Sequence, residues 1–392
     1  MAISGEVRIG VIGLGRRGFQ LRFVHDVEKG VRVVAGADPL PEAREKFLGW
    51  MKTWNKAAAD VASDYRELLA RADINAIFIT SCDYLHEEHA IAALRAGKAV
   101  YLDKPMAITL AGCDRILEAA AASGALLFVG HNMRYAPVIL QMKKLIDSGA
   151  IGEPKAAWCR HFVGYGGDAY FKDWHSERAK TTGLLLQKGV HDIDVLHWLA
   201  GGASRRVVGM GGLTLYDKIT DRRSPETRPD CSWNDAHWPP LSQTGLSPVI
   251  DVEDVSQVLM QLETGGFASY QQCHYAPDQW RNYTVIGTEG RVENLGDSPG
   301  EAEVCLWDRR VGYLPRGQKQ FPIPQSEGGH GGADPSIVAE FIRCLRGGAK
   351  PRTSPVAARD AVGAAYQATM SLREGCVPKD VPPVPPELAA KF

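Results

Sequence analysis

Three glycines at positions 13, 15 and 18 form the strongest chemical signal in the sequence. They stand in the motif G-L-G-R-R-G, which directly follows the β-rich run 7–13. In such a turn Gly13 permits the tight bend, Gly15 lets a pyrophosphate approach the backbone, and Gly18 allows close packing of helix on strand. The N–H groups and the dipole at the start of a helix favour the bound phosphates. The motif predicts a dinucleotide site; the alternative is a glycine-rich turn in another α/β protein.

An acidic side chain, Asp38, ends the next β-rich run at 31–38. A carboxylate at this position accepts hydrogen bonds from both adenosine ribose hydroxyls and repels a 2′-phosphate, so the sequence predicts NAD in preference to NADP. Two arginines of the glycine motif are expected to add positive charge beside the phosphates. The residues expected to bind the cofactor from these two segments are Gly13, Leu14, Gly15, Arg16, Arg17, Gly18 and Asp38.

Two further residues are of types that can move a proton. Lys104 follows the run 99–103, and the carboxyl ends of strands face the ligand crevice of an open α/β sheet. A lysine there can hydrogen-bond a substrate hydroxyl and exchange its proton, although a surface lysine at a strand end is the commoner case. His191 lies four residues after Gln187, so both project from one face of a helix. A histidine can shuttle protons near neutral pH, and a histidine buried between domains is an equally good interpretation.

The elements that must position these groups appear as short apolar runs separated by helical segments. Nearly wholly apolar strands are typical of a parallel sheet covered on both faces. Helices are predicted between the runs at 86–97 and 109–124, the second capped by Thr109 and terminated by Gly124. Strands that alternate with helices indicate a doubly wound sheet. The runs lie at 7–13, 31–38, 75–81, 99–103 and 126–130.

The pattern changes near residue 150, where longer runs of alternating polarity begin. Alternation is typical of an antiparallel or mixed sheet with one covered face. Helices are predicted over 183–199, 335–346 and 356–373. The polar, proline-rich segment 216–250 is too long for an ordinary connection, so it is either a structural arm or a loop that shapes a substrate cleft. The alternating runs lie at 156–163, 206–215, 255–262, 267–274 and 282–288.

Composition excludes several classes of partner. The 392 residues include 45 Lys and Arg against 46 Asp and Glu, so the net charge of −1 argues against a nucleic-acid binder. The sequence contains no run of 18 apolar residues, so we expect no helix that spans a membrane. Eight scattered cysteines without a C-x-x-C pair read as reduced thiols, which predicts a cytoplasmic protein. No metal is predicted, because H-E-E-H at 86–89 lacks the four-residue histidine spacing of a zinc motif.

Together and in this order, these features resemble the Gfo/Idh/MocA oxidoreductase family. Besides the glycine motif, T-S-C-D-Y-L-H at 80–86 resembles the family's T-P-N-x-x-H, and D-K-P at 103–105 resembles its E-K-P. V-G-H-N-M-R-Y at 129–135 is similar to a family segment that ends in Arg-Phe/Tyr. G-L-L-L-Q-K-G-V-H-D-I-D at 183–194 resembles G-x-L-x-D-x-G-x-H-x-x-D. The resemblance covers nearly the whole chain.

The resemblance implies an α/β protein with two domains. An N-terminal Rossmann domain with a doubly wound parallel sheet would span 1–132, and an α+β domain with an open, mostly antiparallel sheet would span 133–392. The C-terminal helices are free to pack back on the first domain, and the open sheet would form a homodimer or homotetramer. Lys104 and His191 would be the catalytic pair. Ser81, His86, Asp103, Lys104 and Asn132 would complete the cofactor site, and Arg134, Trp174, His175, Gln187, Lys188 and Asp192 are the candidate substrate contacts.

The activity implied is hydride transfer between NAD and a CH–OH carbon of a sugar, glycoside or inositol-like polyol. One departure matters: the family's acidic residue four positions before the histidine is Gln187 here, and a carboxamide cannot relay a proton. An alternative on the same fold is a redox-assisted glycoside hydrolase, which oxidises, eliminates, hydrates and reduces again. A non-catalytic NAD-binding protein is the third interpretation.

Overall fold

The computed structural model describes residues 2–24, 26, 28–55, 58–347 and 350–392. By its internal contacts the chain divides into two units, each described here by itself. The first unit comprises residues 1–135, 328–359 and 384–392, and the second comprises 136–327 and 360–383. The first unit therefore combines segments from both ends of the chain. The domain boundary expected at residue 132 stays a prediction.

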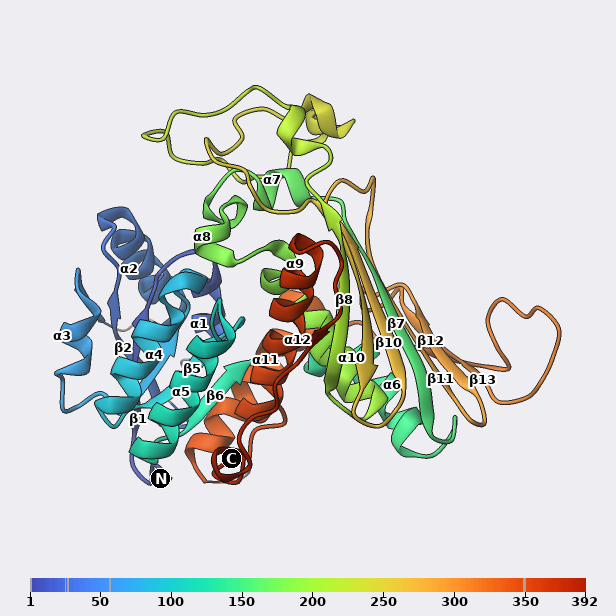
Figure 1. Cartoon of the computed structure of the whole chain (residues 1–392). Helices are drawn as coiled ribbons and strands as arrows, with labels where there is room; N and C mark the ends of the chain where they lie inside the picture. Colours follow the sequence, from blue (N-terminus) through green and yellow to red (C-terminus); the bar gives the residue numbers. More distant parts are fainter. Residues whose placement is uncertain (1, 25, 27, 56–57, 348–349) are drawn as a thin grey trace. The chain divides into compact units, whose positions relative to one another are not determined.

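The first unit contains a six-stranded, wholly parallel sheet among its described residues, with strand order β3-β2-β1-β4-β5-β6 (Figure 1). This is the doubly wound order, with the crevice where the order reverses between β1 and β4. The near absence of polar side chains in β1, β4 and β5 agrees with burial on both faces. The strands are β1 (Val7–Ile12), β2 (Val31–Ala37), β3 (Asp60–Ala62), β4 (Ala76–Ile79), β5 (Ala99–Asp103) and β6 (Leu127–Gly130).

The helix α5 (Leu110–Ser123) begins and ends at the residues that the sequence predicts. The Thr109 side chain accepts a hydrogen bond from the backbone N–H of Gly112, and Gly124 ends the same helix with a φ of 65°. Phe341 of α11 packs edge-on against three stacked rings of the sheet, Phe78, Tyr101 and Phe128, which ties the late segment 328–359 to this unit. The helices are α1 (Leu21–Val24), α2 (Pro41–Asn55), α3 (Tyr65–Leu69), α4 (His86–Arg95), α5 (Leu110–Ser123), α11 (Gly329–Leu345) and α13 (Pro386–Ala389).

The second unit contains a nine-stranded sheet among its described residues, in which only β7 and β10 run parallel. Helices α6 (Pro137–Asp147) and α10 (Val190–Ala200) pack on one face of it. Met210, Leu259 and Phe267 are exposed from β8, β9 and β10 on the face that the helices leave open. The strands are β7 (Pro154–Val163), β8 (Ser204–Gly212), β9 (Val255–Leu262), β10 (Phe267–Cys273), β11 (Gln279–Gly287), β12 (Arg291–Leu295), β13 (Glu303–Trp307), β14 (Lys319–Pro322) and β15 (Lys379–Asp380).

The long connection 216–250 folds as an arm with three short 3-10 turns, η5 (Tyr216–Lys218), η6 (Asp235–His237) and η7 (Pro240–Ser242). Its apolar residues form a small core with Tyr170 and Phe171 of the same unit. Two hydrogen bonds fix it further: the His237 imidazole pairs with Asp168 at 2.6 Å, and Ser247 N–H donates to the Phe171 carbonyl at 2.8 Å. The arm is therefore a packed part of the second unit.

The remaining elements of the second unit are short. They are α7 (Gly166–Tyr170), η4 (Trp174–Ser176), α8 (Arg178–Thr181) and α9 (Leu184–Gln187). Helix α12 (Pro355–Arg373) begins in the first unit and continues in the second. No helix among the described residues is both long and apolar enough to cross a membrane.

Candidate functional site

The glycine turn follows β1, and its first glycine is required by the backbone. Gly13 has a φ of 87°, and a Cβ there would lie 2.4 Å from the backbone nitrogen of Ser81. Its N–H donates to the carbonyl of Ala37 at 2.9 Å, which fixes the turn to the end of β2. Only glycine fits both the left-handed conformation and this close approach.

The other two glycines of the turn serve different purposes. A Cβ on Gly15 would meet nothing within 4 Å, so its backbone faces open space that a pyrophosphate can enter. A Cβ on Gly18 would lie 2.6 Å from the Trp50 ring, so this glycine lets α2 pack closely. The helix that the motif predicts is short: the 3-10 helix η1 (Arg16–Gln20) leads into the four-residue α1.

Gly13 and Gly15 predict two different mutant phenotypes. Gly15→Ala is expected to leave the melting temperature unchanged and to weaken NAD binding by about tenfold, roughly 1.4 kcal/mol, because the methyl group occupies only the open space. Gly13→Ala is expected to lower the melting temperature, because its methyl group collides with the backbone. Calorimetric titration with NAD and differential scanning calorimetry measure the two effects. A Gly15→Ala variant that binds NAD like the parent would place the pyrophosphate elsewhere.

Asp38 is held rigidly at the end of β2. One carboxylate oxygen accepts from the N–H of Leu14 and the other from the N–H of Leu40, both at 2.9 Å. A carboxylate has about four lone-pair sites, so two remain for ribose hydroxyls. The donor and acceptor pattern at Asp38 and the open backbone at Gly15 both fit NAD.

Arg17 is bound by carboxylates of the protein. Its Nε donates to Asp103 at 2.8 Å, and its Nη1 lies 3.6 Å from Asp334. The other oxygen of Asp103 accepts from the backbone N–H of Lys104 at 3.0 Å. Arg17 thus connects the glycine turn to the end of β5, whereas Arg16 is exposed. The positive charge expected from Arg16 and Arg17 beside the phosphates stays a prediction.

Asp334 is a buried acceptor on which several parts of the first unit converge. It accepts from Asn132 Nδ2 at 2.8 Å, from Gln20 Nε2 at 3.2 Å and from His330 Nδ1 at 3.1 Å. Burial would raise its pKa, but the bond from His330 and the charges of His330 and Arg17 lower it. Asn132 Oδ1 is buried and has no hydrogen-bond partner within the described ranges. Contact of Asn132 with the cofactor stays a prediction.

The loops after β4 and β5 are linked through His86, whose two ring nitrogens lie 2.6 Å from the Pro105 carbonyl and 3.0 Å from the Ser81 carbonyl. The Ser81 hydroxyl in turn pairs with His89 at 2.9 Å. Burial lowers the pKa of His89 to about 4, so this imidazole is neutral at pH 7. His86 therefore positions the loop that carries Lys104. Contact of Ser81 or His86 with the cofactor stays a prediction.

Lys104 lies half-buried immediately after β5, at the carboxyl edge of the parallel sheet. Arg134 lies in η3 (Asn132–Tyr135) after β6, and its Nη1 donates to the carbonyl of Arg352 at 3.3 Å. The sequence places both residues after strands of the sheet, and the structure confirms those positions. Contact of Arg134 with substrate stays a prediction.

In the second unit the helix predicted over 183–199 forms as two pieces, α9 and α10, separated by Lys188 and Gly189. A Cβ on Gly189 would lie 2.4 Å from the Leu185 carbonyl oxygen and 2.8 Å from the Tyr270 ring. Glycine is therefore needed for the chain to break here against β10. Gln187 ends α9 and His191 belongs to α10; both are buried.

Asp192 is fully buried and its carboxylate is occupied by protein donors. It accepts from His161 Nδ1 at 2.9 Å and from the Tyr283 hydroxyl, and Arg281 Nε lies 3.1 Å away. Burial would raise the pKa of Asp192, but Arg281 and His161 lower it. Burial and Arg281 lower the pKa of His161 to about 3, so Arg281 is the counter-ion. These contacts show a structural role for Asp192, and its predicted substrate contact stays untested.

Two aromatic candidates lie side by side in η4. The rings of Trp174 and His175 stack at a centroid distance of 3.8 Å, and the His175 Nδ1 pairs with Asp173. Tyr170 meets the His175 ring edge-on at 5.2 Å. Flat aromatic faces suit the apolar faces of sugar rings.

Lys188 is the most unusual member of the candidate set, because its ammonium group is buried and donates a hydrogen bond to a phenol. Its Nζ donates to the Tyr165 hydroxyl at 2.9 Å and lies over the rings of Tyr165 and Tyr170. Lys188 is only 4% exposed. The sequence gives no signal for Tyr165, which lies in the irregular G-Y-G-G-D segment after β7.

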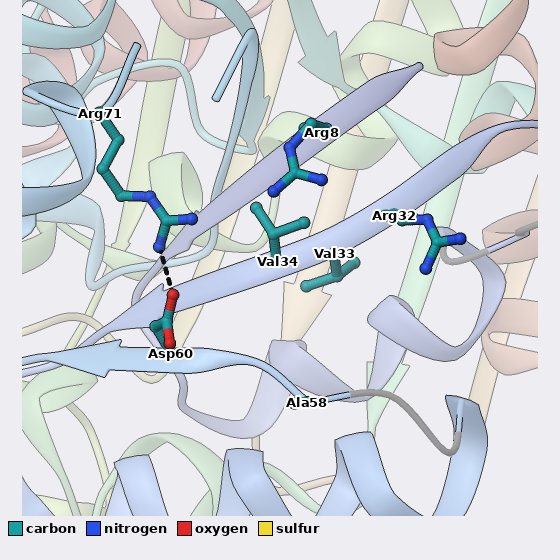
Figure 2. A pocket seen from close by; sticks show the side chains of 7 residues that line it. All are labelled: Arg8, Arg32, Val33, Val34, Ala58, Asp60 and Arg71. Atoms are coloured by element: carbon teal, nitrogen blue, oxygen red, sulfur yellow. Dashed lines mark hydrogen bonds and ion pairs between the residues drawn. The ribbon is translucent and has the colours of Figure 1, made fainter. Parts of the chain in front are cut away.

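A separate cavity of about 180 Å³ lies beside β1 and β2 and is lined by Arg8, Arg32 and Arg71 (Figure 2). Arg8 and Arg32 pair with Glu6, and Arg71 pairs with Asp60. The positive charge is therefore already compensated by carboxylates. Both Arg8 and Arg32 stand near the starts of their strands, away from the carboxyl ends that face ligands in such sheets. We assign no role in the reaction to this cavity.

A parallel Rossmann sheet with this glycine turn, together with a second unit built on a mostly antiparallel sheet, defines the class of NAD-binding oxidoreductases with a separate α/β domain. A family model described as "Oxidoreductase family, NAD-binding Rossmann fold" matches residues 7–131, and one described as "Oxidoreductase family, C-terminal alpha/beta domain" matches 143–378. The chain belongs to this family, Gfo/Idh/MocA. It is an oxidoreductase, and its cofactor is NAD.

Two relatives that the chain resembles are inositol dehydrogenases. An inositol 2-dehydrogenase/D-chiro-inositol 3-dehydrogenase of Halalkalibacterium halodurans is 35% identical over 195 residues, which cover 49% of this chain and 52% of that protein. The corresponding enzyme of Shouchella clausii is 35% identical over 222 residues, 56% of this chain and 59% of that protein. The chain thus spans little more than half the length of these relatives.

Solved structures share the fold over nearly the whole chain. A levoglucosan dehydrogenase in complex with NADH superposes with a TM-score of 0.75 at 21% identity, covering 97% of this chain and all of that one. An oxidoreductase domain protein from Kribbella flavida superposes with a TM-score of 0.77 at 18% identity, covering 96% and 100%. At these identities the likeness shows the fold alone.

Proposed function

We propose that the protein transfers a hydride between NAD and a CH–OH carbon of a sugar, glycoside or inositol-like polyol. One observation carries this proposal: Asp103 binds both Arg17 of the glycine turn and the backbone of Lys104. A single carboxylate thus links the cofactor turn to a lysine that can handle a proton. Oxidation of an alcohol needs both, because the carbon loses a hydride and the oxygen loses a proton.

In the proposed reaction, bound NAD supplies the hydride acceptor. Gly13, Gly15 and Asp38 hold the dinucleotide, and Lys104 binds the substrate hydroxyl and exchanges its proton. His191 of the second unit is proposed as the second proton-handling group. Gln187 cannot support an imidazolium by charge, so His191 lacks the carboxylate partner that its position implies.

The experiment that tests this function is a screen for NADH formation, followed at the nicotinamide absorbance band. Purified protein is incubated with NAD or NADP and a panel of inositols, sugars, anhydrosugars and glycosides. Reduction of NAD by at least one member, and slower reduction of NADP, is the expected result. Aglycone release from an aryl glycoside without net NADH would favour the redox-assisted hydrolase instead. NAD binding with no activity on the whole panel would favour a non-catalytic protein.

We further propose a cytoplasmic homodimer or homotetramer. Two observations support this proposal: none of the eight cysteines forms a disulfide in the part of the chain that the structure describes, and Met210, Leu259 and Phe267 are exposed on the open sheet face. Light scattering after gel filtration measures the oligomeric state; a monomer at micromolar concentration would contradict the proposal.

A further inference from the structure

The buried Lys188–Tyr165 pair raises a question that the proposed function leaves open, namely how a proton is handled without a carboxylate at position 187. Lys188 directly follows Gln187 in the link between α9 and α10, three residues before His191. Tyr165 follows β7 and precedes α7 of the same unit. The pair therefore joins the residues between β7 and α7 to the link between α9 and α10.

The geometry around Tyr165 is that of a stabilised phenolate. The Lys188 ammonium donates to the Tyr165 oxygen at 2.9 Å, and the Tyr170 hydroxyl provides a second hydrogen bond. Two donors on one phenol oxygen favour the form in which that oxygen carries a negative charge. Tyr165 is also the half-buried member of the pair, whereas Lys188 and Tyr170 are buried.

The charges around Tyr165 also favour the ionised form of its phenol. Burial would raise the pKa of Tyr165, but the charges of Lys188 and Arg281 and the bonds from Lys188 and Tyr170 lower it. Burial lowers the pKa of Lys188, against the opposing effect of Tyr165. The pKa values of both members of the pair are therefore lowered.

The other charged and titratable groups packed here do not compete for this role. Asp192 is paired with Arg281 and accepts from His161 and Tyr283. Burial keeps His161 neutral at pH 7. Burial likewise lowers the pKa of His274, whose ring meets Tyr170 edge-on at 5.2 Å.

We propose that Tyr165, hydrogen-bonded to Lys188, is a further proton-handling residue, through which the proton that leaves the substrate hydroxyl reaches solvent. This inference rests on the proposed function. In the oxidation the substrate O–H bond breaks, and its proton, taken up first by the groups named in the proposed function, then bonds to the Tyr165 oxygen; NAD, when bound, would take the C–H electron pair as hydride. The phenol then returns its proton to solvent, and the reverse reaction uses the same steps backwards. The pair supplies the proton function that Gln187 lacks.

The first test needs no substrate. Ultraviolet titration of the holoprotein is expected to show one tyrosine that ionises below the ordinary range of about 10, and this signal is expected to vanish in Tyr165→Phe and in Lys188→Met. Tyr275→Phe is the matched control. Tyr275 packs against the same small apolar core as Tyr165, but its hydroxyl contacts Thr214, so its removal should leave the signal unchanged. A low-range ionisation that persists in Tyr165→Phe would overturn the assignment.

The second test uses a substrate found in the NADH screen. The kcat of the parent is expected to rise with pH through the Tyr165 ionisation, because the phenolate is the active form. Tyr165→Phe is expected to lower kcat by about 10²–10⁴-fold and to remove that rise while NAD affinity is retained. Lys188→Arg is expected to restore part of the rise that Lys188→Met removes.

The two tests separate the two proposals. A low tyrosine ionisation with no turnover on any alcohol would contradict the proposed function and leave the acid–base pair standing. Turnover with an unchanged pH profile in Tyr165→Phe would contradict the proton-handling role of Tyr165 and leave the proposed function standing.

Discussion

Lys104→Ala is expected to lower kcat by about 10²–10⁴-fold, the usual contribution of a positioned proton-transfer group. The residue lies directly after β5 and next to Asp103, which also binds Arg17. Because the alanine variant keeps the backbone N–H that donates to Asp103, the cofactor turn should stay intact. NAD affinity measured by titration calorimetry is therefore expected to change by less than about threefold.

A matched control for this variant is Lys98→Ala. Lys98 lies just before the same strand, and its ammonium donates to the carbonyls of Arg71 and Ile74. It stands at the opposite end of β5 from Lys104, so its removal should affect stability without lowering kcat. Equal turnover of the Lys104→Ala variant and the parent on the best substrate would remove Lys104 from the mechanism.

The largest stability effect is expected at Asp192. Asp192→Ala leaves the buried guanidinium of Arg281 without its counter-ion, which costs about 3–5 kcal/mol in comparable cases. Denaturant unfolding followed by tryptophan fluorescence measures the loss, with Glu301→Ala as an exposed control in the same unit. The second removal, Arg281→Ala in the Asp192→Ala background, is expected to cost less than it does alone, because the charges then leave together.

The pH dependence of this contribution follows from the lowered pKa of Asp192. The folded state binds the proton more weakly than the unfolded chain does, whose aspartate pKa is about 3.9. The stabilisation is therefore complete above that value and is lost as the pH falls through the lower, folded-state pKa.

Fully additive losses in the double variant would contradict the pairing of Asp192 with Arg281.

Local sequence signals predict the first unit well. The strand 99–103 has the same bounds in the structure, and the helix over 109–124 ends at the predicted cap and glycine. Such signals depend on a few adjacent residues, namely apolar runs and capping side chains. The strands β3, β14 and β15 carry little of this pattern, since they have two to four residues and are mostly exposed.

The sequence does not predict which residues far apart in the chain form hydrogen bonds with one another. The bonds of Asp334 to Gln20 and Asn132 join residues more than 200 positions apart, and nothing local marks them. Tyr165 lies in an irregular loop without periodicity, so only the contact with Lys188 reveals it. The sequence does identify Lys188 as a candidate, although the reason for its importance, a buried ammonium against a phenol, appears only in three dimensions.

The return of the segment 328–359 to the first unit affects how the protein is made. A ribosome releases residues 1–132 long before Asp334 and Phe341 exist, so the nascent parallel sheet lacks both the acceptor for Asn132 and the ring that packs on Phe78. The unit that carries the glycine turn, although most of its residues precede the second unit in the chain, is therefore completed late in synthesis. Until then the aromatic surface that Phe341 covers is exposed, and exposed apolar surface of this kind favours aggregation.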